Sequence, residues 1–200
     1  MDDQHLLETV RRLGGTITST EAVRAGISWR DLYAHRDKGS LVELSRGVYR
    51  LADAQPTPYL DFLAVARRCL QCTICLTSAL AYWDLTDEIP SRVHIAVPRD
   101  TWRPRIDYPP TRVYVFAADT FELGREHAST ETGETFAVYS VTRSIVDALR
   151  LRNRVGPDLA YESLRRYLEL PGSSPRELLV LAGKLRAKSI VARALEVLAG

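Results

Sequence analysis

Apolar residues recur at helical spacing near the start of the chain, and glycines interrupt the pattern. Four of them share one face of a predicted first helix: Leu6, Leu7, Val10 and Leu13. Gly14-Gly15 ends this helix. Thr18-Ser-Thr-Glu21 is then a capping box, in which a hydroxyl and a carboxylate satisfy free amides at a helix start. We expect a short second helix there, with Ala22 and Val23 facing inward and Gly26 at its end.

A third helix is predicted from the next start signal. Ser28 is its N-cap, and Asp31 lies beside the positive end of the helix dipole. Its predicted buried stripe has three residues: Trp29, Leu32 and Tyr33. Lys38-Gly39 ends the helix. Alternating residues then predict two strands around the turn Ser45-Arg46-Gly47: Leu41–Leu44 and Val48–Leu51. Three helices followed by a hairpin are the order of a winged helix-turn-helix.

The segment Ala52–Pro58 contains two prolines and small polar residues, which is typical of a linker. We therefore predict a winged helix-turn-helix domain over residues 1–54 and a second domain over residues 55–200.

The second domain reads as a mixture of helices and strands. Two helices begin it: Thr57 to about Leu70, and a helix around Leu76–Trp83. Alternation predicts four strands: Val93–Val97, Val113–Phe116, Phe121–Glu126 and Phe136–Tyr139, the last two forming a pair. Four helices complete it: Arg143–Arg152, Pro157–Leu168, Pro175–Leu185 and Ser189–Leu198. The predicted fold class is α+β, a winged helix-turn-helix followed by a mixed α/β domain that ends in several helices.

The composition is that of a globular protein. Apolar residues make up 46% of the 200 residues, no run reaches the length of a membrane span, and the first residues are acidic where a signal peptide would be basic. We expect a cytoplasmic protein that does not contact a membrane.

The three cysteines lie at Cys69, Cys72 and Cys75, an odd number within seven residues, which excludes a disulfide framework. A fourth cysteine of an iron–sulfur motif would fall at Ala79. We interpret the cysteines as buried and inert and expect neither a metal nor a cofactor, the alternative being a zinc site that a distant histidine completes.

The formal net charge is only +2, so contact with DNA requires local clustering. Residues 28–50 hold five Lys or Arg against three acidic residues. Arg30 lies in the half of a recognition helix that reads base edges, and Arg46 is at the wing tip. The predicted DNA-binding residues are Ser28, Arg30, His35, Lys38, Arg46 and Arg50. The alternative is that these cations only solvate a surface helix, or that the winged helix contacts protein.

A second basic stretch runs from Arg92 to Arg112 and includes Arg99, Arg103 and Arg105. It fits a longer DNA footprint or an acidic partner. A solvated strand-and-loop edge is the other interpretation.

Sequence motifs for catalysis are largely missing. The chain has no phosphate-binding glycine loop, no H-E-x-x-H helix and no pair of acidic residues spaced to hold two magnesium ions. We therefore do not expect an enzyme of metabolism.

The segment Gly39–Leu51, which follows Ile27–Leu32, resembles the helix-and-wing region of AbiEi-type antitoxins. The family pattern G-x-L-x-x-x-x-R-G-V-Y is nearly complete here. Three later segments also resemble the family, in order: Leu76–Leu85, Val93–Pro98 and Val141–Leu149. Taken together, these segments extend the resemblance over most of the chain.

The resemblance implies an antitoxin that neutralises a nucleotidyltransferase-like toxin and represses their shared operon by binding promoter DNA. In the family-like C-terminal segments, the polar residues that we expect to serve antitoxin function are Ser78, Arg143 and Asp147. A structural salt bridge is the other interpretation of Asp147. Two other functions stay open: a toxin-modifying enzyme that transfers a phosphoryl group, and a transcriptional regulator whose second domain senses a ligand.

Overall fold

The computed structural model describes residues 3–199, and these form two compact units. One unit contains the residues up to Leu70 together with Pro104–Thr111 and His127–Phe136. The other contains Gln71–Arg103, Arg112–Glu126 and the chain from Ala137 on. The domain boundary near residue 54 stays a prediction. None of the helices within residues 3–199 is long and apolar enough to cross a membrane.

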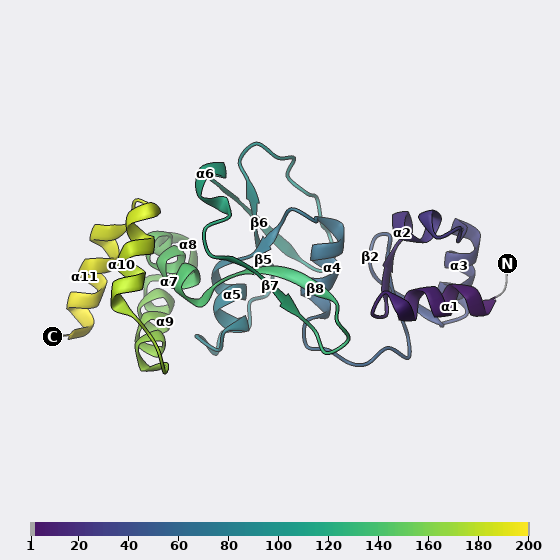
Figure 1. Ribbon diagram of the computed structural model, residues 1–200, viewed down its shortest axis with the longest axis horizontal. Coiled ribbons are helices and arrows are strands. Elements are labelled where there is room, and N and C mark those ends of the chain that lie inside the picture. Colours follow the sequence, from purple (N-terminus) through teal and green to yellow (C-terminus); the bar gives the residue numbers. More distant parts are fainter. Residues whose placement is uncertain (1–2, 200) are drawn as a thin grey trace. The chain divides into compact units, whose positions relative to one another are not determined.

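The first unit begins with the expected three helices and hairpin (Figure 1). The helices are α1 (Asp3–Arg12), α2 (Ser19–Arg24) and α3 (Trp29–Asp37), and the hairpin strands are β2 (Leu41–Ser45) and β3 (Val48–Leu51). A short strand that the pattern did not predict, β1 (Thr16–Thr18), pairs antiparallel with β3, giving the strand order β1-β3-β2. A three-residue strand is too short to show an alternation, so only its pairing reveals it.

The core of this unit follows the helical and strand periodicity. Apolar residues from all three helices and from the strands pack together: Leu6, Val10, Ile17, Ala22, Ile27, Leu32, Leu41, Tyr49 and Leu51. Outside this core, Val23 is 49% exposed and Leu13 is 37% exposed, so the inward orientation predicted for these two residues is wrong. The helix α4 (Leu60–Arg68) packs against β2 within the same unit and is shorter than the predicted helix from Thr57.

The second unit is built on the larger part of a five-stranded sheet with the order β6-β5-β4-β8-β7. The strands are β4 (Thr73–Ile74), β5 (Val93–Pro98), β6 (Thr111–Phe116), β7 (Arg125–Ser129) and β8 (Thr135–Tyr139). β4 pairs antiparallel with β5 and parallel with β8. The predicted strand pair is present, but its first strand begins at Arg125, because the residues before it form the short helix α6 (Ala118–Phe121).

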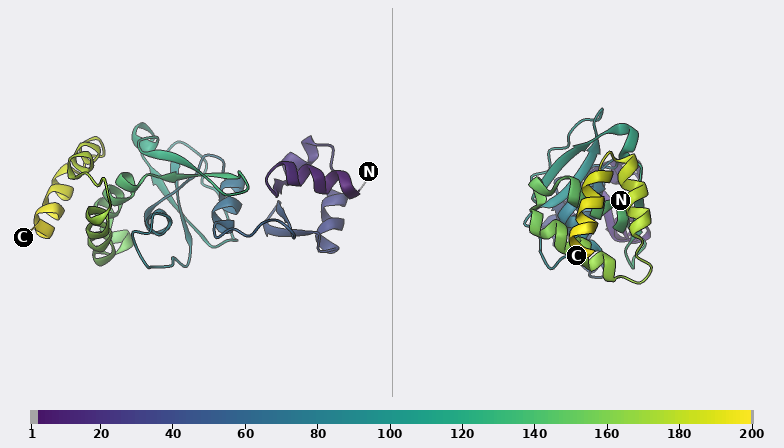
Figure 2. Two further views of the ribbon diagram at one scale, coloured as in Figure 1. Left: turned by 60° about the horizontal axis from the view of Figure 1, so that its bottom comes forward. Right: turned by 90° about the vertical axis from the view of Figure 1, so that its left-hand side faces the viewer.

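Helices complete the second unit. α5 (Leu76–Tyr82) contacts β5, and α7 (Val141–Arg150) contacts α5. The last four helices are α8 (Arg152–Val155), α9 (Pro157–Glu169), α10 (Pro175–Lys184) and α11 (Lys188–Ala199). α7 also packs against α9, α10 and α11, and the views in Figures 1 and 2 both place α10 and α11 on the side of α7 away from the sheet. These helices therefore form a layer of their own, whose core includes Ile145, Leu164 and Val191.

Candidate nucleic-acid interface

The two helix-start signals of the sequence fix the beginnings of α2 and α3. Thr18 Oγ1 accepts a hydrogen bond from Glu21 N at 3.1 Å, and Glu21 Oε2 accepts one from Thr18 N at 2.8 Å, which completes the capping box of α2. Ser28 Oγ accepts from Asp31 N at 3.2 Å and donates to Asp31 Oδ2 at 2.8 Å. The start of α3 is therefore fixed by two side chains that also face solvent in part.

The exposed face of α3 differs from the predicted one. Trp29 is 50% exposed and Tyr33 is 41% exposed, whereas His35 is 3% exposed. The prediction that Trp29 and Tyr33 are buried is thus wrong, and His35 does not lie on the exposed face. The physical reason is that α3 packs on the core through Leu32 and His35, one helical turn apart, so the helix is rotated by about one residue from the predicted orientation.

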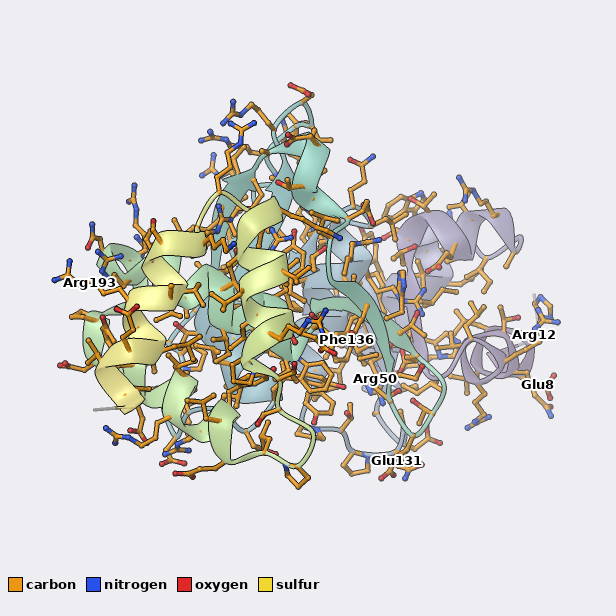
Figure 3. The ribbon with its side chains drawn as sticks, turned by 60° about the vertical axis from the view of Figure 1, so that its left-hand side comes forward. Glu8, Arg12, Arg50, Glu131, Phe136 and Arg193 are labelled. Carbon is orange, nitrogen blue, oxygen red and sulfur yellow. The ribbon has the colours of Figure 1, made fainter. Side chains whose placement is uncertain are left out.

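Arg50 is also absent from the exposed surface, although its position on the wing strand predicted a DNA contact. Its side chain is 5% exposed, and Nη1 lies 2.5 Å from Glu134 Oε2, whose side chain is fully buried. Nη1 also donates to Thr16 Oγ1 at 2.8 Å, and Nη2 donates to the carbonyl of Gln55 at 2.9 Å. In Figure 3 the labelled Arg50 lies near the loop that carries Glu131. Because the guanidinium of Arg50 is buried and bonded to these partners, Arg50 has a structural role and does not contact DNA.

Of the residues predicted to bind DNA, Ser28, Arg30, Lys38 and Arg46 are exposed and therefore accessible. Among residues 3–199, neither Arg30 nor Arg46 has a carboxylate partner, so both guanidinium groups face solvent with their charge uncompensated. Lys38 follows the last turn of α3. These are the cations that a phosphate backbone can approach.

A groove of about 900 Å³ lies between α2, α3, the wing and α4, and we call it the arginine groove. Its lining includes Trp29 and Tyr33 from α3 and five arginines from four elements: Arg24, Arg36, Arg46, Arg67 and Arg68. Only two acidic residues line it, and both are engaged by arginines. Arg67 Nη1 lies 2.8 Å from Glu21 Oε1, and Arg36 Nη1 lies 3.6 Å from Glu43 Oε2. The groove is therefore positively charged.

The wing tip is held in place at the mouth of this groove. Gly47 N donates to Glu43 Oε1 at 3.0 Å, and Arg68 Nη1 donates to the carbonyl of Arg46 at 3.0 Å. Ser19 Oγ donates to the carbonyl of Gly47 at 3.2 Å. Arg46 thus projects from a turn that three separate elements support.

Arg36 is held over the ring of Tyr33, with its guanidinium carbon 4.9 Å from the ring centroid. Its hydrogen bonds to Asp37 raise the pKa of this guanidinium, so it stays charged. Sequence reasoning missed Arg24, Arg36, Arg67 and Arg68 as members of the site. Arg24 and Arg36 lie near predicted helix ends, but Arg67 and Arg68 follow the predicted linker, and no pattern in the sequence brings them to the wing.

The three residues expected to serve antitoxin function lie inside the second unit. Ser78, Arg143 and Asp147 are each 0% exposed. Ser78 Oγ accepts from His94 N at 2.9 Å, and Arg143 Nε donates to Asp147 Oδ2 at 2.9 Å. A large partner cannot touch buried groups, so a direct contact between these three side chains and a toxin is not supported by the structure.

Arg143 is the centre of a buried ionic network. Its Nη1 donates to the carbonyls of Thr120 and Leu123, and its guanidinium carbon is 4.3 Å from the ring centroid of Tyr139. Asp147 also accepts from Arg150 Nε at 2.6 Å. Burial, and then the charge of Asp147, raise the pKa of the Cys75 thiol, which favours its protonated form. Within residues 3–199, no three His, Cys, Asp or Glu side chains form a group that could hold a metal ion.

The basic stretch between Arg92 and Arg112 is exposed at each of its arginines: Arg92, Arg99, Arg103, Arg105 and Arg112. Arg105 is paired with Asp107 at 3.5 Å, with both side chains largely in solvent. A pair of this kind contributes little to stability. A role of this stretch in binding stays a prediction.

Comparison with known proteins finds a similarity for the N-terminal helices and hairpin. Residues 4–52 match the model of a family described as "Transcriptional regulator, AbiEi antitoxin". Among solved structures, the chain is similar to one described as "Crystal structure of RV2827C protein from Mycobacterium tuberculosis", with a TM-score of 0.55 and 17% identity. The similarity covers 96% of this chain and 80% of that one, and at this identity it shows a shared fold alone. No curated protein matches the chain.

Proposed function

We propose that this protein binds the promoter DNA of its own operon and silences a toxin encoded beside it, since residues 4–52 match the family model described as "Transcriptional regulator, AbiEi antitoxin". The observation that carries DNA binding is the exposed face formed by α3 and the wing. Arg30 and Arg46 are uncompensated there, beside a groove lined by five arginines and two paired glutamates.

The geometry suits duplex DNA in the manner of a winged helix. The first half of a recognition helix reaches base edges in the major groove, which places Arg30 at a guanine. The wing tip at Arg46 contacts the adjacent phosphates or minor groove. Arg24, Arg68 and Lys38 lie around these two elements and add phosphate contacts. His35 and Arg50 are not part of this proposal, because both are buried.

Binding of the purified protein to DNA from upstream of its own gene tests this role. Each cation that neutralises a phosphate makes the affinity fall more steeply with salt concentration. Removing one such contact should lower the magnitude of the slope of log affinity against log salt by about 0.9. Arg30→Ala should cost roughly 1–3 kcal/mol if its contact with guanine is bidentate, and only on the specific sequence. Unchanged promoter affinity in both Arg30→Ala and Arg46→Ala would remove the proposed surface.

Toxin silencing is the second part of the proposal, and we take the toxin to be nucleotidyltransferase-like. Growth of cells that express the neighbouring gene, with and without this protein, tests it. A variant that lacks operator binding, such as Arg46→Glu, should still rescue growth if the second unit carries neutralisation. Mass spectrometry of the co-expressed toxin then separates the two chemical routes. An added phosphoryl mass indicates covalent modification, and an unmodified but silenced toxin indicates direct binding.

A further inference from the structure

The exposed face of the recognition helix is aromatic as well as cationic. Trp29 and Tyr33 are four residues apart on α3 and are 50% and 41% exposed. Their ring centroids are 6.2 Å apart, with the planes tilted by 49°. Both rings line the arginine groove, and Trp29 belongs to the first turn of the helix. Two large apolar side chains therefore occupy the part of α3 that reaches base edges.

The major groove offers an aromatic ring one apolar feature, the C5 methyl group of thymine. Arginine and asparagine read hydrogen-bonding atoms, whereas a ring gains energy by burying this methyl group. We propose, on the basis of the proposed operator binding, that Trp29 and Tyr33 determine specificity by contacting thymine methyl groups beside the guanine read by Arg30.

The surroundings of the rings favour DNA over a second copy of this chain as the occupant. Five arginines line the groove, and its two glutamates are already engaged by Arg67 and Arg36. A second copy docked through the same face would bring like charges together, which opposes association. A phosphate backbone instead supplies the opposite charge on both sides of the bases.

Tyr33 is also held in position for such a contact. The guanidinium of Arg36 lies 4.9 Å from its ring centroid, and this guanidinium is itself fixed by two hydrogen bonds to Asp37. A ring whose orientation is already set loses less freedom when it meets the base. The Tyr33 ring is thus preorganised to contact the base that faces it.

Uracil substitution in the operator tests the proposal, because uracil differs from thymine only by the missing methyl group. The DNA is the segment upstream of the gene that the wild-type protein protects, with single thymines replaced by uracil along each strand. At the positions facing the rings we expect affinity to fall about four-fold per methyl group, the factor that corresponds to burying one methyl-sized group. All other positions should show no change.

Protein variants assign the effect to the two rings. Trp29→Ala and Tyr33→Ala should bind thymine and uracil operators equally at the positions concerned, while Tyr33→Phe should keep the discrimination. Val180→Ala, at an exposed site on α10, is the matched control and should behave as the wild type. Thermal unfolding confirms that each variant folds, as expected for side chains that are about half exposed.

Four results overturn the proposal, and they differ in what they say of the proposed function. A wild-type protein that binds its upstream DNA but has equal affinity for thymine and uracil operators refutes the aromatic readout alone. Discrimination that survives in Trp29→Ala and Tyr33→Ala does the same. A wild-type protein that does not bind this DNA refutes operator binding and the readout together. A change of oligomeric state in Trp29→Ala, without methyl discrimination, identifies the face as a contact between copies.

Discussion

At the scale of single residues, the clearest lesson concerns buried charge. Arg50 and Arg143 look alike in the sequence, since both are arginines in family-like segments. In the structure each is enclosed, Arg50 with Glu134 and Arg143 with Asp147. An ion pair away from water is costly unless every charge is compensated, so these partners cannot be removed singly. Arg46, in contrast, is exposed and available.

Asp147→Ala should destabilise the second unit by about 3–5 kcal/mol, because the guanidinium of Arg143 would stay buried without its counter-charge. Urea unfolding measures the loss. Glu162→Ala is the control, since its carboxylate pairs with Arg165 and Arg166 at the surface and each such pair should contribute less than about 1 kcal/mol. Equal losses in both variants would contradict the importance of the buried network.

His94 makes stability depend on pH. Burial, and then the charge of Arg112, lower the pKa of His94 from 6.5 to about 4. The unfolded chain takes up a proton near pH 6.5 and the folded chain only near pH 4, so this residue makes the folded state lose stability as pH falls through that window. His94→Gln should therefore decline less steeply in thermal midpoint between pH 6.5 and pH 4 than the wild type.

The control for this experiment is His127→Gln, because His127 is exposed. This variant should follow the wild-type decline. Carboxylates also titrate in this range, so the informative quantity is the difference in slope between variant and wild type. A His94→Gln variant with the wild-type slope would show that the imidazole does not contribute.

At the scale of elements, the helix-start signals were predicted correctly, whereas the face that α3 turns toward the core was predicted wrongly. The capping box at Thr18 and the N-cap at Ser28 both appear with the predicted hydrogen bonds. These depend on residues three positions apart, which local chemistry determines. The orientation of α3 about its axis depends on the elements that pack against it. The apolar character of Trp29 predicted that this residue faces the core, whereas Leu32 and His35 do so.

The wing turn gives a prediction at this scale. Gly47 has φ +74°, and a Cβ there would lie 2.9 Å from Ser19 Oγ, whereas Gly39 has φ +79° with open space around it. Alanine at either position costs roughly 1–2 kcal/mol for the left-handed backbone. Gly47→Ala should cost more in thermal unfolding and also weaken operator binding, because the clash displaces the turn that carries Arg46.

A second substitution checks the physical reason. Ser19→Ala removes the hydroxyl that the new Cβ would meet, so the double variant Ser19→Ala/Gly47→Ala should recover most of the excess loss relative to Gly39→Ala. If the double variant stays as impaired as Gly47→Ala, the steric explanation fails.

At the scale of the whole molecule, charge is important through its location and not its sum. The net charge is only +2, yet the arginine groove gathers five guanidinium groups. Arg46→Glu should weaken operator binding strongly and lower the magnitude of the slope of log affinity against log salt by about 0.9 for the phosphate contact that is lost. Arg193→Glu changes the net charge by the same amount at an exposed site on α11, labelled in Figure 3, and should bind as the wild type. Filter binding at two salt concentrations measures both, and equal losses would indicate attraction by net charge alone.

The sequence by itself determined the three N-terminal helices, the hairpin that follows them, the helix caps and the likeness of this region to AbiEi antitoxins. These features depend on residues close together in the chain. Only the tertiary structure decided that Trp29 and Tyr33 face solvent, that His35 and Arg50 are buried, and that Arg67 and Arg68 join the wing. The exposure of a side chain depends on elements distant in sequence, because burial is decided by what packs against it.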